Sequence, residues 1–353
     1  MYDILIHPAT HAKVVEYHDA LRAGDIPGGN LKALLSRNNS GLPDAASLLE
    51  MMVNTKHPHI FAESSVHGDG TDWNARELSI LGDLSMAVPV MVYDDGRHAC
   101  PHIHESPFAA TLLYTPGALL LNGCRFVPAD WKEVTHDDRI DQAAYNALYE
   151  RRLLPLFHYV NEQAKSIGHL AVITVPGLGC GQFAGPFRGK LGECLRQALV
   201  NLLERHGQAW SNIAVVWFDP YSECTSATQE IHHIAFKVRP LARGNAETPQ
   251  LCPPETYRET SETGQPLRLY SVVAWDHVSW PGNDFYAGAR ATDDGVKAAA
   301  TSSMFSMTGI EGRYDPKRHE YRPPEDYRDW EDVVLRNQLA IRVKENLHVL
   351  PNG

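Results

Sequence analysis

Three aspartates late in the chain have the type and spacing that chemistry at a sugar requires. Asp276, Asp284 and Asp294 are separated by eight and ten residues, and the first follows an apolar run that ends near Trp275. The aromatic and amide side chains between them are Trp280, Asn283, Phe285 and Tyr286. Several carboxylates at a strand end, beside aromatic walls, are typical of a small-molecule site that holds a sugar.

The reaction that such carboxylates support is cleavage of a glycosidic bond. Breaking an N- or O-glycosidic bond to ribose builds positive charge on the anomeric carbon. One carboxylate can stabilise that charge while another polarises the attacking water or holds ribose hydroxyls. A carboxyl group near an aromatic wall can also have a raised pKa and donate a proton. The sequence leaves open which aspartate has which role.

Part of this segment also has a purely structural explanation. Thr292 has the side chain of a helix N-cap, and Asp293 and Asp294 would lie in the first helical turn. Acidic residues there stabilise the positive end of a helix by a few tenths to about 1 kcal/mol. Helix capping does not account for Asp276 or Asp284, so the functional interpretation is favoured for the segment as a whole.

A glycine-rich turn about 100 residues earlier is the second chemical signal. The apolar run Leu170–Val175 leads through Pro176 into this turn, and a helical pattern follows at Lys190–His206. The turn consists of Gly177, Leu178, Gly179, Cys180, Gly181, Gln182 and Phe183. Three alternating glycines allow main-chain N–H groups to face a ligand, and a helix N-terminus adds positive partial charge. This layout favours a diphosphate cradle over a plain strand-to-helix connection.

The turn fits neither of two common phosphate loops. In a dinucleotide-binding fingerprint the third glycine would fall at Gln182. In a P-loop the first glycine would fall at Ala184, and Lys190 is followed by Leu191 instead of Ser or Thr. A cysteine nucleophile at Cys180 is a further alternative, but no base accompanies it in the sequence.

The turn from Pro176 to Phe183 resembles the diphosphate loop of macrodomains, the ADP-ribose-binding α/β/α family. Loop and aspartate trio together are similar to macrodomain ADP-ribosylhydrolases, most of all to the MavL-type effectors, which remove ADP-ribose from an arginine of ubiquitin. The similarity extends from about His67 to Asn346. It implies a mono-ADP-ribosyl hydrolase whose partner is ADP-ribose on a protein, with no cofactor and no metal ion. The cytoplasm of the producing cell, or of a host cell for an effector, is the expected location.

The resemblance also implies roles for individual residues. Backbone amides of Gly177–Phe183 would hold the diphosphate, Asp284 and Asp294 would act at the anomeric carbon, and Asp276 would orient the ribose. The residues expected to wall or contact the ligand are Trp280, Asn283, Phe285 and, after the strand Ile213–Phe218, either Phe218 or Tyr221. A reader module that binds ADP-ribose without cleaving it, and a hydrolase of a free ADP-ribose derivative, remain as alternatives.

Two departures from the family pattern refine these expectations. In ordinary macrodomains the catalytic loop precedes the diphosphate loop, whereas here the acidic segment follows it. A rearranged or circularly permuted strand order is therefore expected. The chain also lacks the paired glutamates of poly(ADP-ribose) glycohydrolases, because Gly181-Gln182 is followed by Phe183. Removal of mono-ADP-ribose is the resulting prediction.

The elements that must position these residues are indicated by hydrophobic periodicity. Helices are expected at Ala9–Ala23, Leu31–Ser36, Ala45–Val53, Asp138–Ser166, Lys190–His206, Asp294–Ser303 and Trp330–Asn346. Strands are expected at Val88–Tyr93, Leu119–Phe126, Leu170–Val175, Ile213–Phe218, Ile234–Val238 and Leu267–Trp275. Apolar strands alternating with helices predict a largely parallel sheet covered on both faces. We predict a helical extension over residues 1–55 and a macrodomain-like three-layer α/β/α catalytic domain over 56–353.

Composition excludes several classes of partner. The 353 residues carry a net charge of −11, which argues against nucleic acid and anionic membranes but not against a single diphosphate held by backbone amides. Six scattered cysteines, with no signal peptide or membrane-spanning run, favour a reducing cytoplasm. A metal site formed by His98, Cys100, His102 and His104 is a weaker hypothesis than a plain loop.

Overall fold

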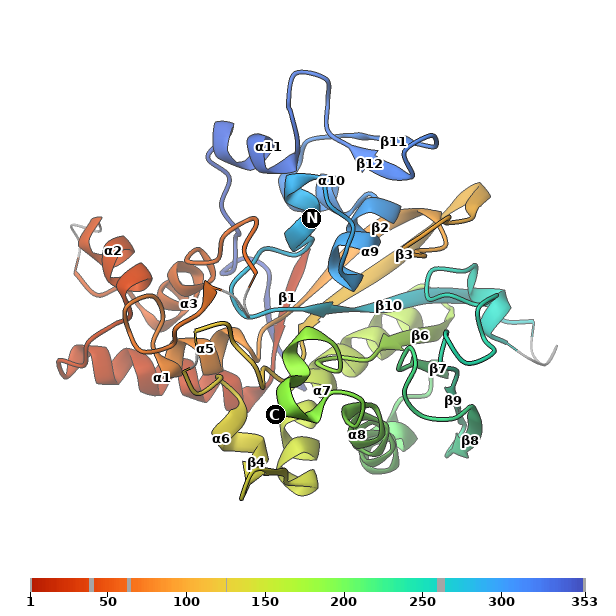
Figure 1. Ribbon diagram of the computed structural model, residues 1–353, viewed down its shortest axis with the longest axis horizontal. Coiled ribbons are helices and arrows are strands. Elements are labelled where there is room, and N and C mark those ends of the chain that lie inside the picture. The colour runs from red at the N-terminus through yellow and green to blue at the C-terminus, as the bar shows by residue number, and fades with distance from the viewer. Residues whose placement is uncertain (1, 38–40, 62–64, 125, 259–263, 352–353) are drawn as a thin grey trace.

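The computed structural model describes residues 2–37, 41–61, 65–124, 126–258 and 264–351 (Figure 1). Within these residues the main sheet has nine strands. In spatial order they are β13 (Leu347–Val349), β1 (Asp3–Ile6), β2 (Ser85–Asp94), β3 (Ile103–Pro116), β10 (Leu267–Trp275), β6 (Leu170–Pro176), β7 (Ile213–Asp219), β9 (Ile234–Val238) and β8 (Ala227–Ile231). Two small hairpins, β4 (Thr135–His136) with β5 (Arg139–Ile140) and β11 (Arg313–Asp315) with β12 (Glu320–Arg322), lie outside it.

The middle of the sheet is parallel, and its strands are apolar on both faces. Strands β3, β10, β6, β7 and β9 run in one direction, whereas β2 and β8 are antiparallel to their neighbours. β10 comes after β6 in the sequence but lies between β3 and β6, and its Ser271 pairs with Leu112 on one side and Thr174 on the other. The strand order is therefore rearranged, as the late position of the acidic segment predicts.

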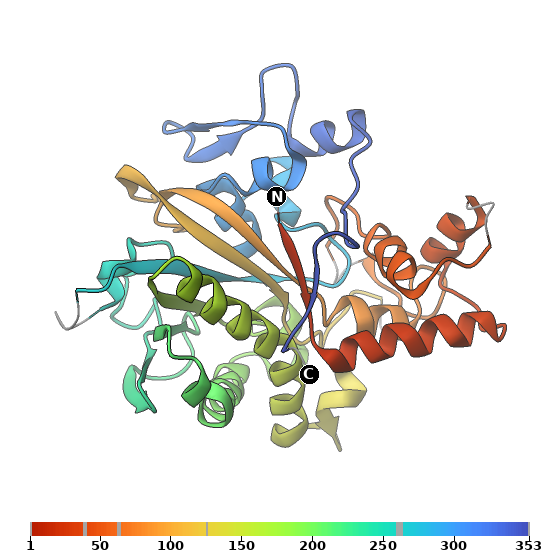
Figure 2. The same ribbon diagram turned by 180° about the vertical axis from the view of Figure 1, so that it is seen from behind.

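Helices cover both faces of this sheet (Figures 1 and 2). One face carries α6 (Trp131–Val134), α7 (Gln142–Ser166) and α8 (Leu191–His206), and the other carries α9 (Asp293–Ala300), α10 (Ser303–Thr308) and α11 (Trp330–Arg336). Short 3₁₀ turns are η1 (Gln182–Phe187), η2 (Gly207–Ala209), η3 (Pro254–Tyr257) and η4 (Asn283–Ala287). The predicted α/β/α class is confirmed. In the part of the chain described, no helix has the length and apolar character to span a bilayer.

The N-terminal region contains the three predicted helices and two elements that the sequence pattern did not indicate. The predicted helices are α1 (Pro8–Arg22), α2 (Gly29–Arg37) and α3 (Ala45–Val53); a fourth helix, α5 (Ala75–Leu81), was not predicted, and all four share a hydrophobic cluster with α9 to α11. Before them, Asp3–Ile6 forms β1, which pairs with β2 and β13. The reason is burial, because Ile4, Leu5 and Ile6 are all inaccessible to solvent. A strand of four residues is too short for its hydrophobic periodicity to be recognised in the sequence.

Three other sequence expectations were wrong. Leu119–Phe126 was expected to be a strand, but its described residues, all except residue 125, form a loop in which Leu119 and Leu120 are buried and Leu121 is exposed. The strand that precedes it, Ile103–Pro116, was missed because its first half is exposed and polar and does not read as an apolar run. The last helix ends at Arg336 and not at Asn346.

A buried ion-pair network fixes the loop that follows β3. Arg152 of α7 donates to Asp83 at 3.2 Å and to Asp130 at 2.8 Å, and all three side chains are essentially inaccessible. The same guanidinium donates to the carbonyl oxygen of Gly117 at 3.0 Å. Because buried charges are stabilised only by partners, Arg152 couples α7 to the end of β3.

Replacement of Arg152 by Met should destabilise the fold strongly. The change leaves Asp83 and Asp130 buried without their shared cation, and such a loss costs about 3–5 kcal/mol. Urea denaturation followed by circular dichroism would measure the free energy of unfolding. The matched control is Arg205→Met on α8. Arg205 forms a half-exposed ion pair with Glu150 of α7, and its loss should cost no more than about 1 kcal/mol. Equal losses for the two variants would contradict the role assigned to Arg152.

Candidate active site

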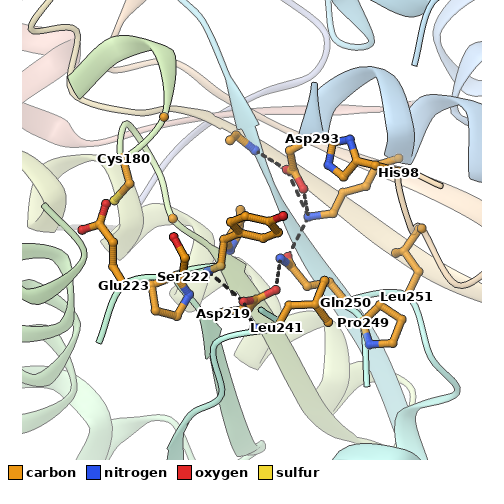
Figure 3. Close-up of a pocket in the computed structure, with 18 of the residues that line it drawn as sticks. His98, Cys180, Asp219, Ser222, Glu223, Leu241, Pro249, Gln250, Leu251 and Asp293 are labelled. Atoms are coloured by element: carbon orange, nitrogen blue, oxygen red, sulfur yellow. Dashed lines mark hydrogen bonds and ion pairs between the residues drawn. The ribbon is translucent and has the colours of Figure 1, made fainter. Parts of the chain in front are cut away.

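A cleft of about 460 Å³ opens at the carboxyl ends of β6, β7 and β10 (Figure 3). Parallel strands deliver their following loops to the same edge of a sheet, which is where α/β proteins bind ligands. The glycine-rich turn contributes Pro176, Gly177, Cys180 and Gly181 to the lining, and the chain after β7 contributes Asp219, Tyr221 and Glu223. The opposite wall contains Gln250, Leu251, Ala274, Asp293 and Lys297.

The glycine-rich turn is held rigidly against the loop after β3. Gly179 has φ +71°, and a Cβ there would lie 2.9 Å from the backbone of Ala118. The Tyr149 hydroxyl donates to the carbonyl oxygen of Leu178 at 2.8 Å and accepts from the amide of Ala118 at 3.0 Å. With Leu178 anchored in the core, Gly177, Cys180 and Gly181 are the residues of the turn that face the cleft.

Other residues of the turn have different surroundings from those expected. Gln182 and Phe183 begin η1 and do not line the cleft. The N-terminus of α8 does not offer a free anion site, because the amide of Gly192 donates to the Glu223 carboxylate at 2.5 Å. Burial raises the pKa of the Cys180 thiol well above its usual value, so this cysteine is a poor nucleophile at neutral pH.

The aromatic residue that reaches the cleft from β7 is Tyr221. Its side chain is 62% exposed and lines the cleft, whereas Phe218 is fully buried beside Phe236, with ring centroids 6.5 Å apart. The expectation that Phe218 contacts the ligand is therefore corrected. Phe218 lies within β7 with its side chain in the core, whereas Tyr221 lies beyond the end of β7, where its side chain is free to face a ligand.

A chain of polar contacts crosses the back of the cleft (Figure 3). Lys297 donates to Asp293 at 3.2 Å and to the side-chain oxygen of Gln250 at 2.9 Å. The Gln250 amide in turn donates to Asp219 at 3.1 Å, and the other oxygen of Asp219 accepts from the amide of Tyr221 at 2.9 Å. Burial lowers the pKa of Lys297 and raises that of Asp219. The four side chains form one fixed wall.

The three predicted aspartates lie together, but behind this wall. Asp276 accepts hydrogen bonds from the amides of Val278 and Ser279, both at 2.7 Å, and from the Asn283 side chain at 3.1 Å. Asp284 accepts from the amides and hydroxyl of the segment that precedes α9, at 2.6 to 3.2 Å. Both carboxylates hold the loop between β10 and α9 in shape, and neither lines the cleft.

Asp294 differs from the other two because one of its oxygens has no partner. Oδ1 accepts from the amide of Gly282 at 2.6 Å, whereas Oδ2 is buried without a hydrogen bond to any residue that the structure describes. Burial, followed by the nearby charges of Asp284 and Asp276, raises the pKa of Asp294 well above its ordinary value. Its carboxyl group is therefore neutral over a wider pH range than an ordinary aspartate.

The remaining predicted residues of the acidic segment are also buried. Trp280 packs edge-on against Tyr286, with ring centroids 6.0 Å apart, and Phe285 belongs to the same hydrophobic cluster. The Asn283 side chain is used internally, because its oxygen accepts from the amide of Ile60 at 2.9 Å. The structure brings these residues to the predicted strand end without exposing them to the cleft.

Sequence reasoning missed Lys56, a buried cation next to the trio. Its ammonium group donates to the carbonyl oxygens of His277, at 2.6 Å, and of Asp276, at 3.3 Å, and lies 4.1 Å from the ring centroid of Trp275. Burial lowers its pKa to about 7, although Asp276 and Asp294 oppose that shift. Nothing in the local pattern singles out this lysine, since its partners lie about 220 residues away.

The histidine-rich stretch that was considered for a metal ion forms the turn between β2 and β3. Nε2 of His104 lies 2.9 Å from the carbonyl oxygen of Leu251, and His98 faces the cleft. Over the described ranges, no three His, Cys, Asp or Glu side chains are grouped closely enough to hold a metal ion.

A three-layer α/β/α fold with a glycine loop at the carboxyl edge of its parallel strands is the architecture expected of a macrodomain. Residues 2–327 match the family described as macrodomain effector MavL, and the chain belongs to that family. The resemblance found in the sequence is thereby confirmed, and the function of the protein is related to ADP-ribose. A search of curated proteins finds no match to the chain.

Replacement of Asp294 by Asn should make stability less dependent on pH. A carboxyl group whose pKa is raised in the folded protein keeps its proton at pH values above 3.8, the ordinary pKa of an aspartate. In the unfolded chain the same carboxyl group loses its proton at these pH values. The folded state then binds more protons than the unfolded state, so stability falls as the pH rises, by up to about 1.4 kcal/mol per pH unit. Asn keeps the acceptor for Gly282 and cannot ionise.

Urea denaturation between pH 4 and pH 8 would test this. Asp294→Asn should be more stable than the wild type at pH 8, and the difference should shrink toward pH 4. The exposed turn residue Asp138 offers a matched control, because Asp138→Asn should leave the pH profile unchanged. If the free energy of unfolding changes with pH in the same way for Asp294→Asn and the wild type, the raised pKa of Asp294 is contradicted.

Proposed function

We propose that the protein is a mono-ADP-ribosyl hydrolase that removes ADP-ribose from a modified protein side chain, with an arginine of ubiquitin as the candidate substrate. One observation carries the proposal. β6 and β10 are neighbouring parallel strands, so the glycine-rich turn after β6 and the first turn of α9, which follows the acidic loop and carries Asp293, border the same cleft. A diphosphate-binding loop beside several carboxylates is what a glycosidic hydrolase of ADP-ribose needs.

The diphosphate would lie on the cleft-lining backbone of Gly177 and Gly181, because the amide of Cys180 already donates to the carbonyl oxygen of Gly177 at 3.0 Å. Backbone amides bind phosphate oxygens without a compensating lysine, which reconciles an anionic ligand with a chain of net charge −11. Arg188, at the edge of the same wall, adds a positive charge. Tyr221, on the opposite side of the turn, would pack against a flat part of the ligand.

The acidic segment would supply the groups that act at the anomeric carbon. Asp294 is the candidate proton donor, because burial and the charges of Asp284 and Asp276 raise its pKa, and a carboxyl group with a raised pKa is better suited to protonate a leaving group. Asp284 is its charged neighbour, and Asp276 shapes the loop that carries both. Because all three are buried, contact with a ligand would require the loop from residue 282 to residue 292 to move.

A reader that binds ADP-ribose without cleaving it is the second candidate. The observation in its favour is that Asp276 and Asp284 are saturated by hydrogen bonds from their own loop. Carboxylates used in this way stabilise a binding site whether or not a reaction takes place there.

Incubation with ubiquitin that carries ADP-ribose on an arginine would separate the two candidates. The wild type should release free ADP-ribose, detected by chromatography, and Asp294→Asn should slow release at least tenfold. A free ADP-ribose derivative, supplied in parallel, should be cleaved more slowly than the modified protein. Binding of ADP-ribose without release from either compound would instead identify a reader.

A negative charge at Gly181 should abolish ligand binding if the turn holds the diphosphate. Gly181 faces the cleft with φ −91°, and a Cβ there would meet no atom within 4 Å, so a larger side chain fits. Isothermal titration with ADP-ribose should show at least a tenfold loss of affinity, about 1.4 kcal/mol, for Gly181→Glu relative to Gly181→Gln. The Gln variant has the same backbone and size without the charge. Equal affinities would place the phosphates elsewhere.

A further inference from the structure

We propose that Asp293, which is not one of the three predicted aspartates, is the carboxylate that contacts the ribose and stabilises charge at its anomeric carbon. This inference rests on the proposed hydrolase function and assigns a catalytic residue to it. It differs from the family-based expectation in placing that role on a residue that already lines the cleft.

Exposure separates Asp293 from its neighbours. Its side chain is 25% exposed and borders the cleft beside Ala274, across from the glycine-rich turn. Asp276, Asp284 and Asp294 are at most 5% exposed and do not border it. Asp293 therefore meets a ligand in the cleft without any movement of the loop.

Helix geometry explains why two adjacent aspartates face different surroundings. Asp293 and Asp294 are the first two residues of α9, and successive side chains on an α-helix point about 100° apart. Asp293 turns toward β10, where its Oδ2 accepts from the amide of Ala274 at 2.9 Å. Asp294 turns inward, toward Gly282.

The contacts of Asp293 hold its carboxylate in one orientation beside a lysine. Lys297, one helical turn later, lies 3.1 Å from Oδ1 and 3.2 Å from Oδ2, and the ammonium is itself held by the carbonyl oxygen of Val272 at 2.5 Å. A carboxylate oxygen accepts more than one hydrogen bond, so both oxygens retain capacity for a ribose hydroxyl. A preorganised negative charge of this kind stabilises an oxocarbenium-like transition state.

The reaction balances without consuming Asp293. The bond between the anomeric carbon and the guanidine nitrogen breaks, and its electron pair goes to the nitrogen. The oxygen of a water molecule bonds to the anomeric carbon, one proton of that water ends on the leaving nitrogen, and the other remains on the new hydroxyl. Asp293 neither gains nor loses a proton in this step and carries no covalent intermediate.

Steady-state hydrolysis of arginine-ADP-ribosylated ubiquitin by Asp293→Asn, Asp293→Glu and Asp138→Asn tests the assignment. Asp293→Asn should lower kcat at least 100-fold while ADP-ribose affinity, from isothermal titration, changes less than threefold. Asp293→Glu keeps the charge and should recover at least a tenth of the wild-type kcat. Asp138→Asn, the same change in an exposed turn, should match the wild type.

Three results would overturn the assignment, and they are distinguishable. If Asp293→Asn keeps kcat within threefold of the wild type, the charge at Asp293 is not used. If Asp293→Glu is as slow as Asp293→Asn and both melt at lower temperature, the residue has only a structural role. If the wild type binds ADP-ribose but releases none from the modified protein, the hydrolase proposal itself fails, and this assignment fails with it.

Discussion

The site depends on one constraint, the hydrogen bonding of β10 as a parallel strand between β3 and β6. That pairing runs from Leu267 to Trp275 and uses both edges of the strand. It places Ala274, and with it the first turn of α9, next to the end of β6, where the glycine-rich turn begins. Two segments about 100 residues apart thus form opposite walls of one cleft. At the sheet edge, β10 would leave them on separate faces of the protein.

The glycine-rich turn depends on a second contact, its close fit against the loop after β3. A Cβ at Gly117 would lie 2.2 Å from the amide nitrogen of Gly179, so the two backbones touch at a distance that only glycine permits. Arg152 donates a hydrogen bond to the carbonyl oxygen of Gly117. The guanidinium of Arg152 is itself held by buried ion pairs with Asp83 and Asp130. The turn is consequently preorganised by α7 and β3, and its cleft-facing amides need no ligand to take up their conformation.

The sequence predicted the long strands that are buried on both faces and missed elements that are short or partly exposed. β6, β7, β9 and β10 are continuous apolar runs because helices cover both sides of the sheet, and α7 and α8 have a clear helical period. β1 is too short for a pattern, and half of β3 is exposed. The glycine turn was placed correctly at a strand end. The side on which each carboxylate lies was not predictable, because it depends on the rotation of α9 and on the shape of its preceding loop.

The hydrogen bonds that the aspartate trio accepts from the loop between β10 and α9 stabilise that loop in its closed conformation. Opening the loop would break the hydrogen bonds that Asp276 and Asp284 accept from it, and each such bond to a charged group contributes about 1.5–3 kcal/mol. In the closed loop, burial and the charges of Asp284 and Asp276 raise the pKa of Asp294, and Lys56, just after the end of α3, donates to two carbonyl oxygens of the loop. The trio then acts as the scaffold that orients the first turn of α9. While the loop stays closed, the aspartate that meets the ligand is Asp293, which this scaffold turns toward the cleft, and Asp294 would reach a ligand only after the loop moves.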